Sequence, residues 1–152
     1  MTQDDFQQEI ETHSDMLYRV AYTILRNDDI CRDALQDTVL KAWEKRAAIR
    51  EPQYFRTWIT RILIRTCYDA QRKRRRVVLL EAIPEPVNTP ADPTLALAIG
   101  ALPEKLRLPL VLCYSEGMNY AEIANALNLP LPTVRGRIHR AKIELRKELN
   151  AE

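Results

Sequence analysis

Glycine and histidine are scarce in this chain of 152 residues, with three and two copies respectively, and this scarcity narrows the possible folds and chemistries. Turn-rich β folds need many glycines, whereas the helix formers Ala, Leu, Glu, Arg and Gln are plentiful here. The sequence also contains no GxxxxGKS or GxxxxGKT phosphate loop and no clustered Ser-His-Asp or metal-ligand pattern. We therefore predict an all-α protein that is not an enzyme, with no catalytic, cofactor or metal site and no small-molecule substrate.

Cysteine is also rare, and its three copies are far apart in the sequence: Cys31, Cys67 and Cys113. No CxxC pair exists, and neither His13 nor His139 lies near a cysteine in the sequence. An odd number of widely spaced thiols argues against a disulfide framework and against a zinc site. All three fall among apolar residues of predicted helices, so we expect buried cysteines with a structural role.

Long apolar runs are missing too. No run approaches the roughly 18 residues that a membrane-spanning helix needs. The N-terminus lacks the succession of basic, apolar and small residues that marks a secretory signal. We therefore expect a cytoplasmic protein.

Charge is nearly balanced, at a formal net value of +2, but it is unevenly distributed. Residues 1–15 contain five acidic side chains and no Lys or Arg, and the charges of residues 77–104 are all acidic. Residues 61–76 carry seven basic side chains against Asp69 alone, and residues 133–149 carry six against two. Two basic zones separated by an acidic stretch indicate two contacts with a polyanion. The alternative is two solvated helix faces.

The first half of the chain has the apolar period of amphipathic helices. From Phe6 to about Arg76, apolar residues recur at steps of three and four. Residues 27–29 interrupt this pattern and supply an N-cap for the next helix, and residues 51–52 mark a loop. The pattern predicts at least three helices within a first domain of residues 1–76.

Proline is concentrated in the middle of the chain. Four prolines fall within ten residues: Pro84, Pro86, Pro90 and Pro93. Because proline at this density prevents a helix, we interpret residues 77–93 as an interdomain linker. The apolar run at 77–80 could be the tail of the preceding helix or a docking segment. The helical pattern resumes at Thr94, which predicts two small helical domains, 1–76 and 94–152, joined by a Pro-rich linker.

Residues 120–138 have the spacing of a helix-turn-helix. Ala124 provides the small residue where the second helix crosses the first, and Asn128 provides a turn residue that tolerates a positive φ. Val134 and Ile138 provide the apolar anchor by which the second helix faces the first. This second helix is basic, and an arginine there can contact guanine or phosphate. A plain helical hairpin with a basic surface is the alternative interpretation.

The C-terminal half resembles region 4 of sigma factors. The matching residues are 101–104, 107, 110–112, 116–117, 120–124, 127, 130–131, 133–135 and 137–142. In that family the second helix of the motif reads the −35 promoter element. The resemblance implies contacts with this DNA from Thr133, Arg135, Arg137 and Arg140. The chain departs from the family at two positions, with Pro132 in place of the usual Gly and Gly136 in place of the usual Ser.

The N-terminal half resembles region 2 of the same family. Residues 33–43 look like the helix that binds the β′ clamp helices of RNA polymerase. Asp33, Gln36 and Asp37 are spaced to share one helix face, and the resemblance implies that they make this contact. Without the resemblance, an ordinary solvated acidic face would be the preferred interpretation.

Residues 55–62, followed by Asp69 and the arginine run, resemble the segment that takes the melted −10 element. The resemblance implies DNA contacts from five residues: Arg56, Trp58, Arg61, Arg65 and Arg72. Arg65 stands where many members have Asn. In the family, flipped bases are captured near this segment, and Tyr54, Phe55 and Trp58 lie there. We nevertheless favour a core position for Trp58, and Trp43 is predicted to be core.

The order of the two regions, with no further domain, is similar to the small extracytoplasmic-function group of the sigma-70 family. The resemblance implies a stress-response transcription factor that binds core RNA polymerase, through the β′ clamp helices and the β flap, and promoter DNA. It also implies an anti-sigma partner, often membrane-bound. Two other hypotheses remain. An operator-binding regulator would explain residues 94–149 but not the acidic face, and a helical adaptor would bind protein alone.

Overall fold

A computed structural model describes residues 1–81 and 93–150 of the chain. Those residues form seven α-helices and two short 3-10 helices, with no strand among them, so the predicted all-α class is confirmed. The chain divides into two compact units, Met1–Glu85 and Pro86–Glu152, as expected for two small helical domains. Most of the predicted Pro-rich linker, residues 82–92, lies outside the described residues.

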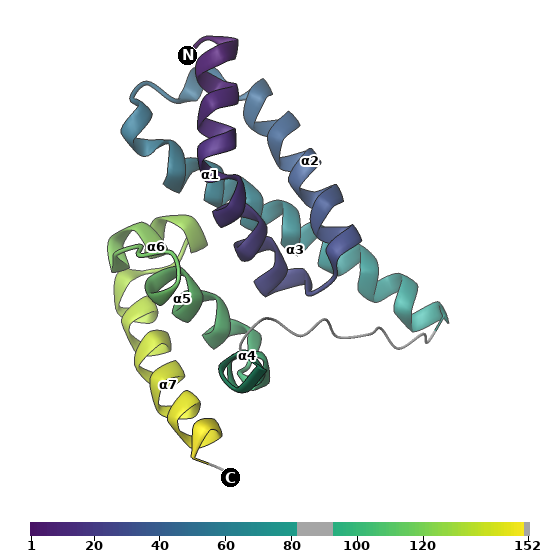
Figure 1. The fold of residues 1–152 in the computed structure, drawn as a ribbon, viewed down its shortest axis with the longest axis vertical. Helices are drawn as coiled ribbons and strands as arrows, with labels where there is room; N and C mark the ends of the chain where they lie inside the picture. The colour runs from purple at the N-terminus through teal and green to yellow at the C-terminus, as the bar shows by residue number, and fades with distance from the viewer. Residues whose placement is uncertain (82–92, 151–152) are drawn as a thin grey trace. The chain divides into compact units, whose positions relative to one another are not determined.

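The N-terminal unit contains three long helices, α1 (Gln3–Leu25), α2 (Asp28–Glu44) and α3 (Phe55–Glu81), each packed against the other two (Figure 1). The 3-10 helices η1 (Arg46–Ala48) and η2 (Pro52–Tyr54) connect α2 to α3. Apolar side chains from all three α-helices fill the core. The largest fully buried ones include Leu17, Val20, Phe55, Ile59 and Leu63.

Local capping explains where these helices begin. The Thr2 side chain accepts a hydrogen bond from the Asp5 N–H, and the Asp5 carboxylate accepts one from the Thr2 N–H, which forms a capping box. α1 ends at Leu25, and its C-cap, Arg26, has a left-handed φ of 55°. Asn27 then caps α2, because its Oδ1 accepts from the Ile30 N–H at 3.0 Å. The predicted N-cap at residues 27–29 is confirmed.

The C-terminal unit contains four shorter helices. They are α4 (Pro93–Ala101), α5 (Glu104–Tyr114), α6 (Tyr120–Leu127) and α7 (Leu131–Leu149). α7 packs against each of the other three (Figure 1). One core cluster joins Leu102, Leu106 and Leu110 to Ala141 of α7. The shorter helices give a smaller core, which α7 holds together.

Two details differ from the sequence expectations. α3 continues to Glu81, so residues 77–81 of the predicted linker are helical, and the apolar run at 77–80 is the tail of a helix, the first of the two interpretations above. Cys31 and Cys67 are buried as predicted, but Cys113 is partly exposed. It lies in the last turn of α5 beside Tyr114, whose side chain is 60% exposed, and the expectation of burial was wrong there.

Candidate polymerase and nucleic-acid interfaces

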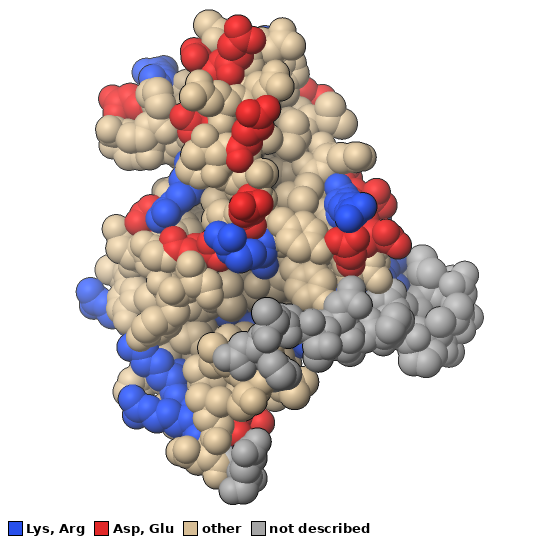
Figure 2. All heavy atoms as spheres, viewed as in Figure 1, with Lys and Arg blue, Asp and Glu red and all other residues tan. Residues whose placement is uncertain are grey.

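The acidic residues of α2 lie on an exposed face. Asp33, Gln36 and Asp37 are all exposed, whereas their neighbours Ala34 and Thr38 are buried against the bundle. Figure 2 shows that acidic side chains are also spread over the visible face of the N-terminal unit. The helical period thus separates a packed side of α2 from a side that can accept hydrogen bonds from a basic partner.

An apolar groove adjoins this acidic face. It lies between α1 and α2, has a volume of about 480 Å³, and is lined by Ile10, Ser14, Leu17, Leu35, Gln36, Val39 and Leu40. Leu40, at the edge of this groove, is 62% exposed. Sequence reasoning missed Leu40, although its place four residues after Gln36 puts it on the same side of the helix.

α3 carries a basic stripe along one side, which we define as Arg61, Arg65, Arg72 and Arg76. Steps of four, seven and four residues keep these side chains on one side of a helix with about 3.6 residues per turn. Arg65, Arg72 and Arg76 are exposed and Arg61 is half-buried. Asp69 lies on the same side and is paired with Arg72. The three exposed arginines give this side of α3 a positive charge, which Asp69 partly offsets.

Two of the predicted −10 residues stand apart from the exposed stripe. Arg56 lies five residues before Arg61, which puts it on a different side of α3 in the first turn, and it is half-buried. Trp58 is on the side of the stripe but half-buried, and its ring centroid lies 5.8 Å from that of Phe55. Geometry alone therefore does not gather all five residues into one surface.

The aromatic residues at the start of α3 differ in exposure. Phe55 is fully buried, and His13 stacks on it with ring centroids 5.7 Å apart. Tyr54, one residue earlier, is 59% exposed. Trp43 is also not fully core, since it is half-buried with the Arg46 guanidinium 3.7 Å from its ring centroid. Among these aromatic residues, Tyr54 presents the most exposed ring.

The helix-turn-helix of the C-terminal unit forms as its sequence predicts. Asn128 has a φ of 56° and ends α6, and Val134 and Ile138 of α7 are fully buried. Asn119 and Glu122 form a capping box at the start of α6. The positive φ and the apolar anchor fix how α7 leaves the turn, and hence which of its side chains face outward.

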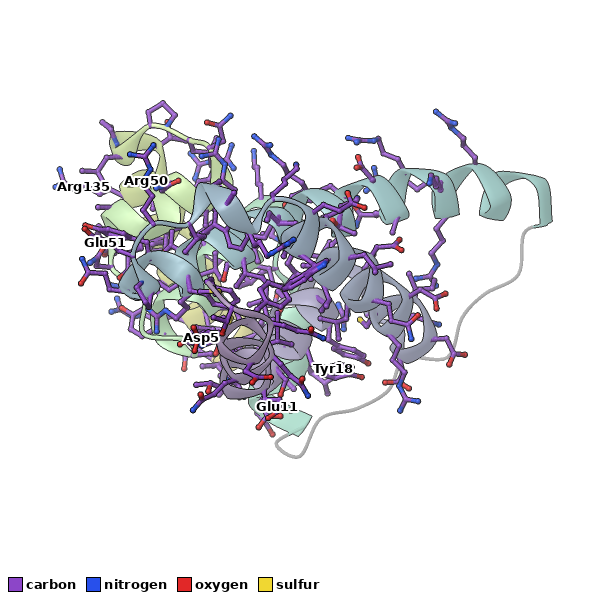
Figure 3. The ribbon with its side chains drawn as sticks, turned by 90° about the horizontal axis from the view of Figure 1, so that it is seen from above. Asp5, Glu11, Tyr18, Arg50, Glu51 and Arg135 are labelled. Carbon is purple, nitrogen blue, oxygen red and sulfur yellow. The ribbon has the colours of Figure 1, made fainter. Side chains whose placement is uncertain are left out.

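The predicted −35 residues of α7 lie on two flanks. Steps of four and three residues place Thr133, Arg137 and Arg140 on one flank, while Arg135 lies on the other and points away from the ribbon (Figure 3). Basic side chains gather over α7 (Figure 2). Gly136 lies between the flanks, opposite the buried side, and a Cβ there would meet nothing within 4 Å. A helix with this pattern can touch both walls of a DNA groove.

A second apolar groove of about 430 Å³ lies within the C-terminal unit. It is lined by Leu95, Ile99, Leu110, Val111, Tyr114, Ser115, Lys142, Leu145, Arg146 and Leu149. The Lys142 ammonium lies 5.2 Å from the Tyr114 ring centroid, and its hydrogen bond with that tyrosine raises the pKa of Lys142. The groove therefore combines an apolar floor with a fixed positive charge.

Burial and hydrogen bonding perturb three further groups in the N-terminal unit. The hydrogen bond that Tyr18 donates to Asp28 raises the pKa of Tyr18 to about 12. Burial raises the pKa of Cys31 to about 11 and that of Cys67 to about 12, which makes both thiols poor nucleophiles. Within residues 1–81 and 93–150, no group of three or more candidate ligands could hold a metal ion. No helix among them is both long and apolar enough to span a membrane.

Comparison with known families matches both units. The Sigma-70 region 2 model matches residues 10–77, and the Sigma-70, region 4 model matches residues 94–145. The chain is 34% identical to the ECF RNA polymerase sigma factor SigE of Mycolicibacterium smegmatis over 92% of this chain and 60% of that protein. It is 29% identical to the ECF RNA polymerase sigma factor SigW of Bacillus subtilis, over 97% of this chain and 90% of that protein. The chain thus spans about three fifths of the first relative and nearly all of the second.

Two solved structures have a fold similar to that of this chain. CnrH, solved in complex with the cytosolic domain of CnrY, is 30% identical, with a TM-score of 0.76 over 99% of this chain and 91% of that one. The fold also matches the sigma factor RpoE of Bartonella quintana, solved with the anti-sigma factor NepR, with a TM-score of 0.84 at 24% identity, covering 97% and 98% of the two chains. Together the two family models cover most of the chain in the order of the family, so the chain belongs to the extracytoplasmic-function group of the sigma-70 family.

Proposed function

We propose that this sigma factor binds core RNA polymerase and directs promoter recognition and DNA melting at the start of transcription. The observation that carries the proposal is the pairing of a region 2 match with a region 4 match, in that order, on one chain. A regulator that only bound an operator would need the helix-turn-helix but not the region 2 unit. The polymerase would supply the chemistry, so we expect no enzymatic activity of the chain's own.

Polymerase binding is assigned to α2. The exposed Asp33, Gln36 and Asp37 can accept hydrogen bonds from basic groups of the β′ clamp helices. The groove at Leu40 would take apolar side chains of the same partner. An apolar patch beside charged acceptors gives affinity and orientation together, which is the usual composition of a specific protein interface.

The −10 element is assigned to α3. Arg61, Arg65 and Arg72 would contact the DNA along the basic stripe, as proposed from the resemblance, with Arg56 and Trp58 at the start of the helix. Tyr54 adds an exposed ring where a flipped base would lie. Stacking of a base on an aromatic ring stabilises binding by about 1–3 kcal/mol.

The −35 element is assigned to α7. Thr133, Arg137 and Arg140 would contact one wall of the major groove and Arg135 the other. With Gly136 between the flanks, no side chain fills the middle, so the helix can approach the bases closely.

Further partners follow from the family. The groove at Tyr114 and Lys142 in the C-terminal unit would receive the β flap. The solved relatives RpoE and CnrH were each solved with a second protein, named as an anti-sigma factor for RpoE. We propose that an anti-sigma factor likewise holds this chain inactive, in the cytoplasm or at the membrane surface, until a stress releases it.

The test is run-off transcription with bacterial core polymerase on promoter fragments from the source genome. Wild type should give discrete transcripts, and Asp33→Ala/Asp37→Ala should lose most of them, because both acceptors at the clamp helices are removed. Asp4→Ala/Asp15→Ala is a matched control, since it removes the same charge from exposed positions on α1. Tight binding to DNA by the chain alone, without any transcript, would instead support an operator-binding regulator.

A further inference from the structure

The C-terminal end of α1 is completed by side chains from α3. A helix leaves its last carbonyls without partners inside the helix. The Arg26 N–H donates to the Tyr22 carbonyl. The carbonyls of the last two residues of α1 are reached from α3: Gln71 Nε2 donates to the Ile24 carbonyl at 3.3 Å, and Arg74 Nη1 donates to the Leu25 carbonyl at 3.0 Å. Residues 47 and 49 positions apart in the sequence therefore meet at this helix end.

Arg74 differs in direction from the cations around it. It lies three residues after Gln71 and seven after the buried Cys67, so it continues the side of α3 that packs on the bundle. Arg72 and Arg76, two residues to either side of it, are exposed and lie on the basic stripe. The run 72–76 is one cluster in the sequence but two surfaces in the structure.

Electrostatics favour this position for a cation. The carbonyl end of a helix carries partial negative charge, which basic side chains in its last turn commonly offset. The last turn of α1 contains no basic residue. Arg74 supplies that charge from another helix, and a charge-assisted hydrogen bond is stronger than a neutral one.

The helix end that Arg74 holds is also the start of α2. Asn27, two residues after Leu25, is the N-cap of α2, and Tyr18 of α1 donates to Asp28 in the first turn of α2. The Leu25 carbonyl that Arg74 contacts is therefore two residues from the residue that caps α2. Side chains from all three helices thus hold residues 24–28, which we call the corner between α1 and α2.

We propose that Arg74 is a positioning residue rather than a phosphate contact: it sets the start of the polymerase-binding helix α2 against the DNA-binding helix α3. The assignment rests on the proposed function, because α2 carries Asp33, Gln36 and Asp37. The proposal gives the arginines of residues 72–76 different roles. Arg72 and Arg76 would contact DNA, whereas Arg74 would hold the corner between α1 and α2.

The test compares Arg74→Gln with Arg76→Gln, since each removes one positive charge from the same helix. Two quantities are measured: the affinity of the chain for core polymerase, and the salt dependence of promoter binding by the holoenzyme. Arg76→Gln should reduce the slope of log K against log salt by about 0.9 and leave core affinity unchanged. Arg74→Gln should leave the slope unchanged and weaken core affinity roughly three- to tenfold.

Amide hydrogen exchange separates positioning from general destabilisation. In Arg74→Gln, exchange should accelerate at residues 26–30 and remain near wild type in the middle of α3. Equal acceleration over all three helices would overturn the proposal, as would a reduced salt slope with unchanged core affinity, or no change in either quantity. If Arg74→Gln folds poorly, Gln71→Met is the substitute, because it removes the other contact from α3 to the end of α1 and alters no charge. It should also weaken the affinity for core polymerase. Unchanged affinity in Gln71→Met would overturn the proposal.

Failure of the proposed function would give a different result from failure of the Arg74 proposal. A wild-type chain that does not bind core polymerase would contradict the sigma role, whatever the variants do. Local acceleration of exchange at residues 26–30 in Arg74→Gln would then still show that Arg74 fixes the corner, but the link to polymerase binding would be overturned.

Discussion

The two units achieve their exposed functional surfaces in different ways. In the N-terminal unit, the period of the long helices separates packed from exposed sides, as on α2, where Asp33 and Asp37 are exposed and Ala34 is buried. In the C-terminal unit, the outward face of α7 depends on one turn, in which Asn128 has a φ of 56°. Helical phase tolerates many substitutions, whereas a left-handed turn residue tolerates few. The comparison teaches that similar chemistry can rest on different structural requirements.

In both units, an arginine side chain donates hydrogen bonds to the carbonyls at the end of another helix. Arg74 donates to the end of α1, and Arg107 donates to the Gly100 and Leu102 carbonyls at the end of α4, at 3.2 and 2.9 Å. In each case an arginine of a later helix completes an earlier one. Counting every arginine as surface charge therefore overestimates the cations that can meet DNA.

The largest expected effects come from the two cores, and they test whether the units unfold separately. Leu63→Ala in α3 and Ile138→Ala in α7 each remove a fully buried side chain, and each should reduce the unfolding free energy of its own unit by about 2–5 kcal/mol. Both tryptophans, Trp43 and Trp58, lie in the N-terminal unit. Thermal unfolding followed by tryptophan fluorescence should therefore shift for Leu63→Ala and stay in place for Ile138→Ala.

Circular dichroism provides the companion measurement, because it detects helix loss in both units. It should register destabilisation in both variants. Leu40→Ala is a suitable control, since that side chain is 62% exposed and should shift neither signal by more than a degree or so. A tryptophan transition that moved equally in Ile138→Ala would mean that the units unfold together, and the comparison between them would fail.

Sequence predicted much of both units because the decisive signals are local. Asn27 as an N-cap, Asn128 as a left-handed turn residue, and the buried Val134 and Ile138 depend on a few neighbouring residues, and all are confirmed. Family resemblance supplied the roles of the surfaces. The roles of individual site residues remain proposals, since the fold alone does not reveal a bound partner.

What sequence missed depends on contacts between distant segments. The contact from Arg74 to Leu25 spans 49 residues, so no local pattern distinguishes Arg74 from Arg72. The groove at Leu40 exists because α1 and α2 pack side by side. The partial exposure of Cys113 depends on where α5 ends relative to its neighbours.

Glycine substitutions sharpen the contrast between helical phase and turn geometry within the C-terminal unit. Gly136 is exposed in α7, and a Cβ added there would have no neighbour within 4 Å, so Gly136→Ala should stabilise the helix by up to about 1 kcal/mol. Gly117, between α5 and α6, has a φ of +67°, so Gly117→Ala should destabilise by about 1 kcal/mol although space is equally open. Urea unfolding of the two variants measures both signs. Two shifts of the same sign would mean that backbone conformation does not decide the outcome at these positions.

An effect of similar size is expected at the corner between α1 and α2, and it depends on pH. Tyr18→Phe removes the hydrogen bond to Asp28 and should reduce the unfolding free energy by about 0.5–1.5 kcal/mol near pH 8. Since folding raises the pKa of Tyr18 from 10.0 to about 12, its contribution is fully present below about pH 10 and is lost as the pH rises toward 12.

The difference between wild type and Tyr18→Phe should therefore shrink between pH 10 and 12, as measured by urea unfolding at several pH values across that window. Tyr54→Phe is the matched control near pH 8, because the Tyr54 side chain is 59% exposed and the same change should have little effect there. A difference for Tyr18→Phe that stayed constant to pH 12 would show that the hydroxyl does not hold the corner. The start of α2 would then depend on Asn27 and on the contacts from α3, and Arg74→Gln should be the more damaging of the two corner substitutions.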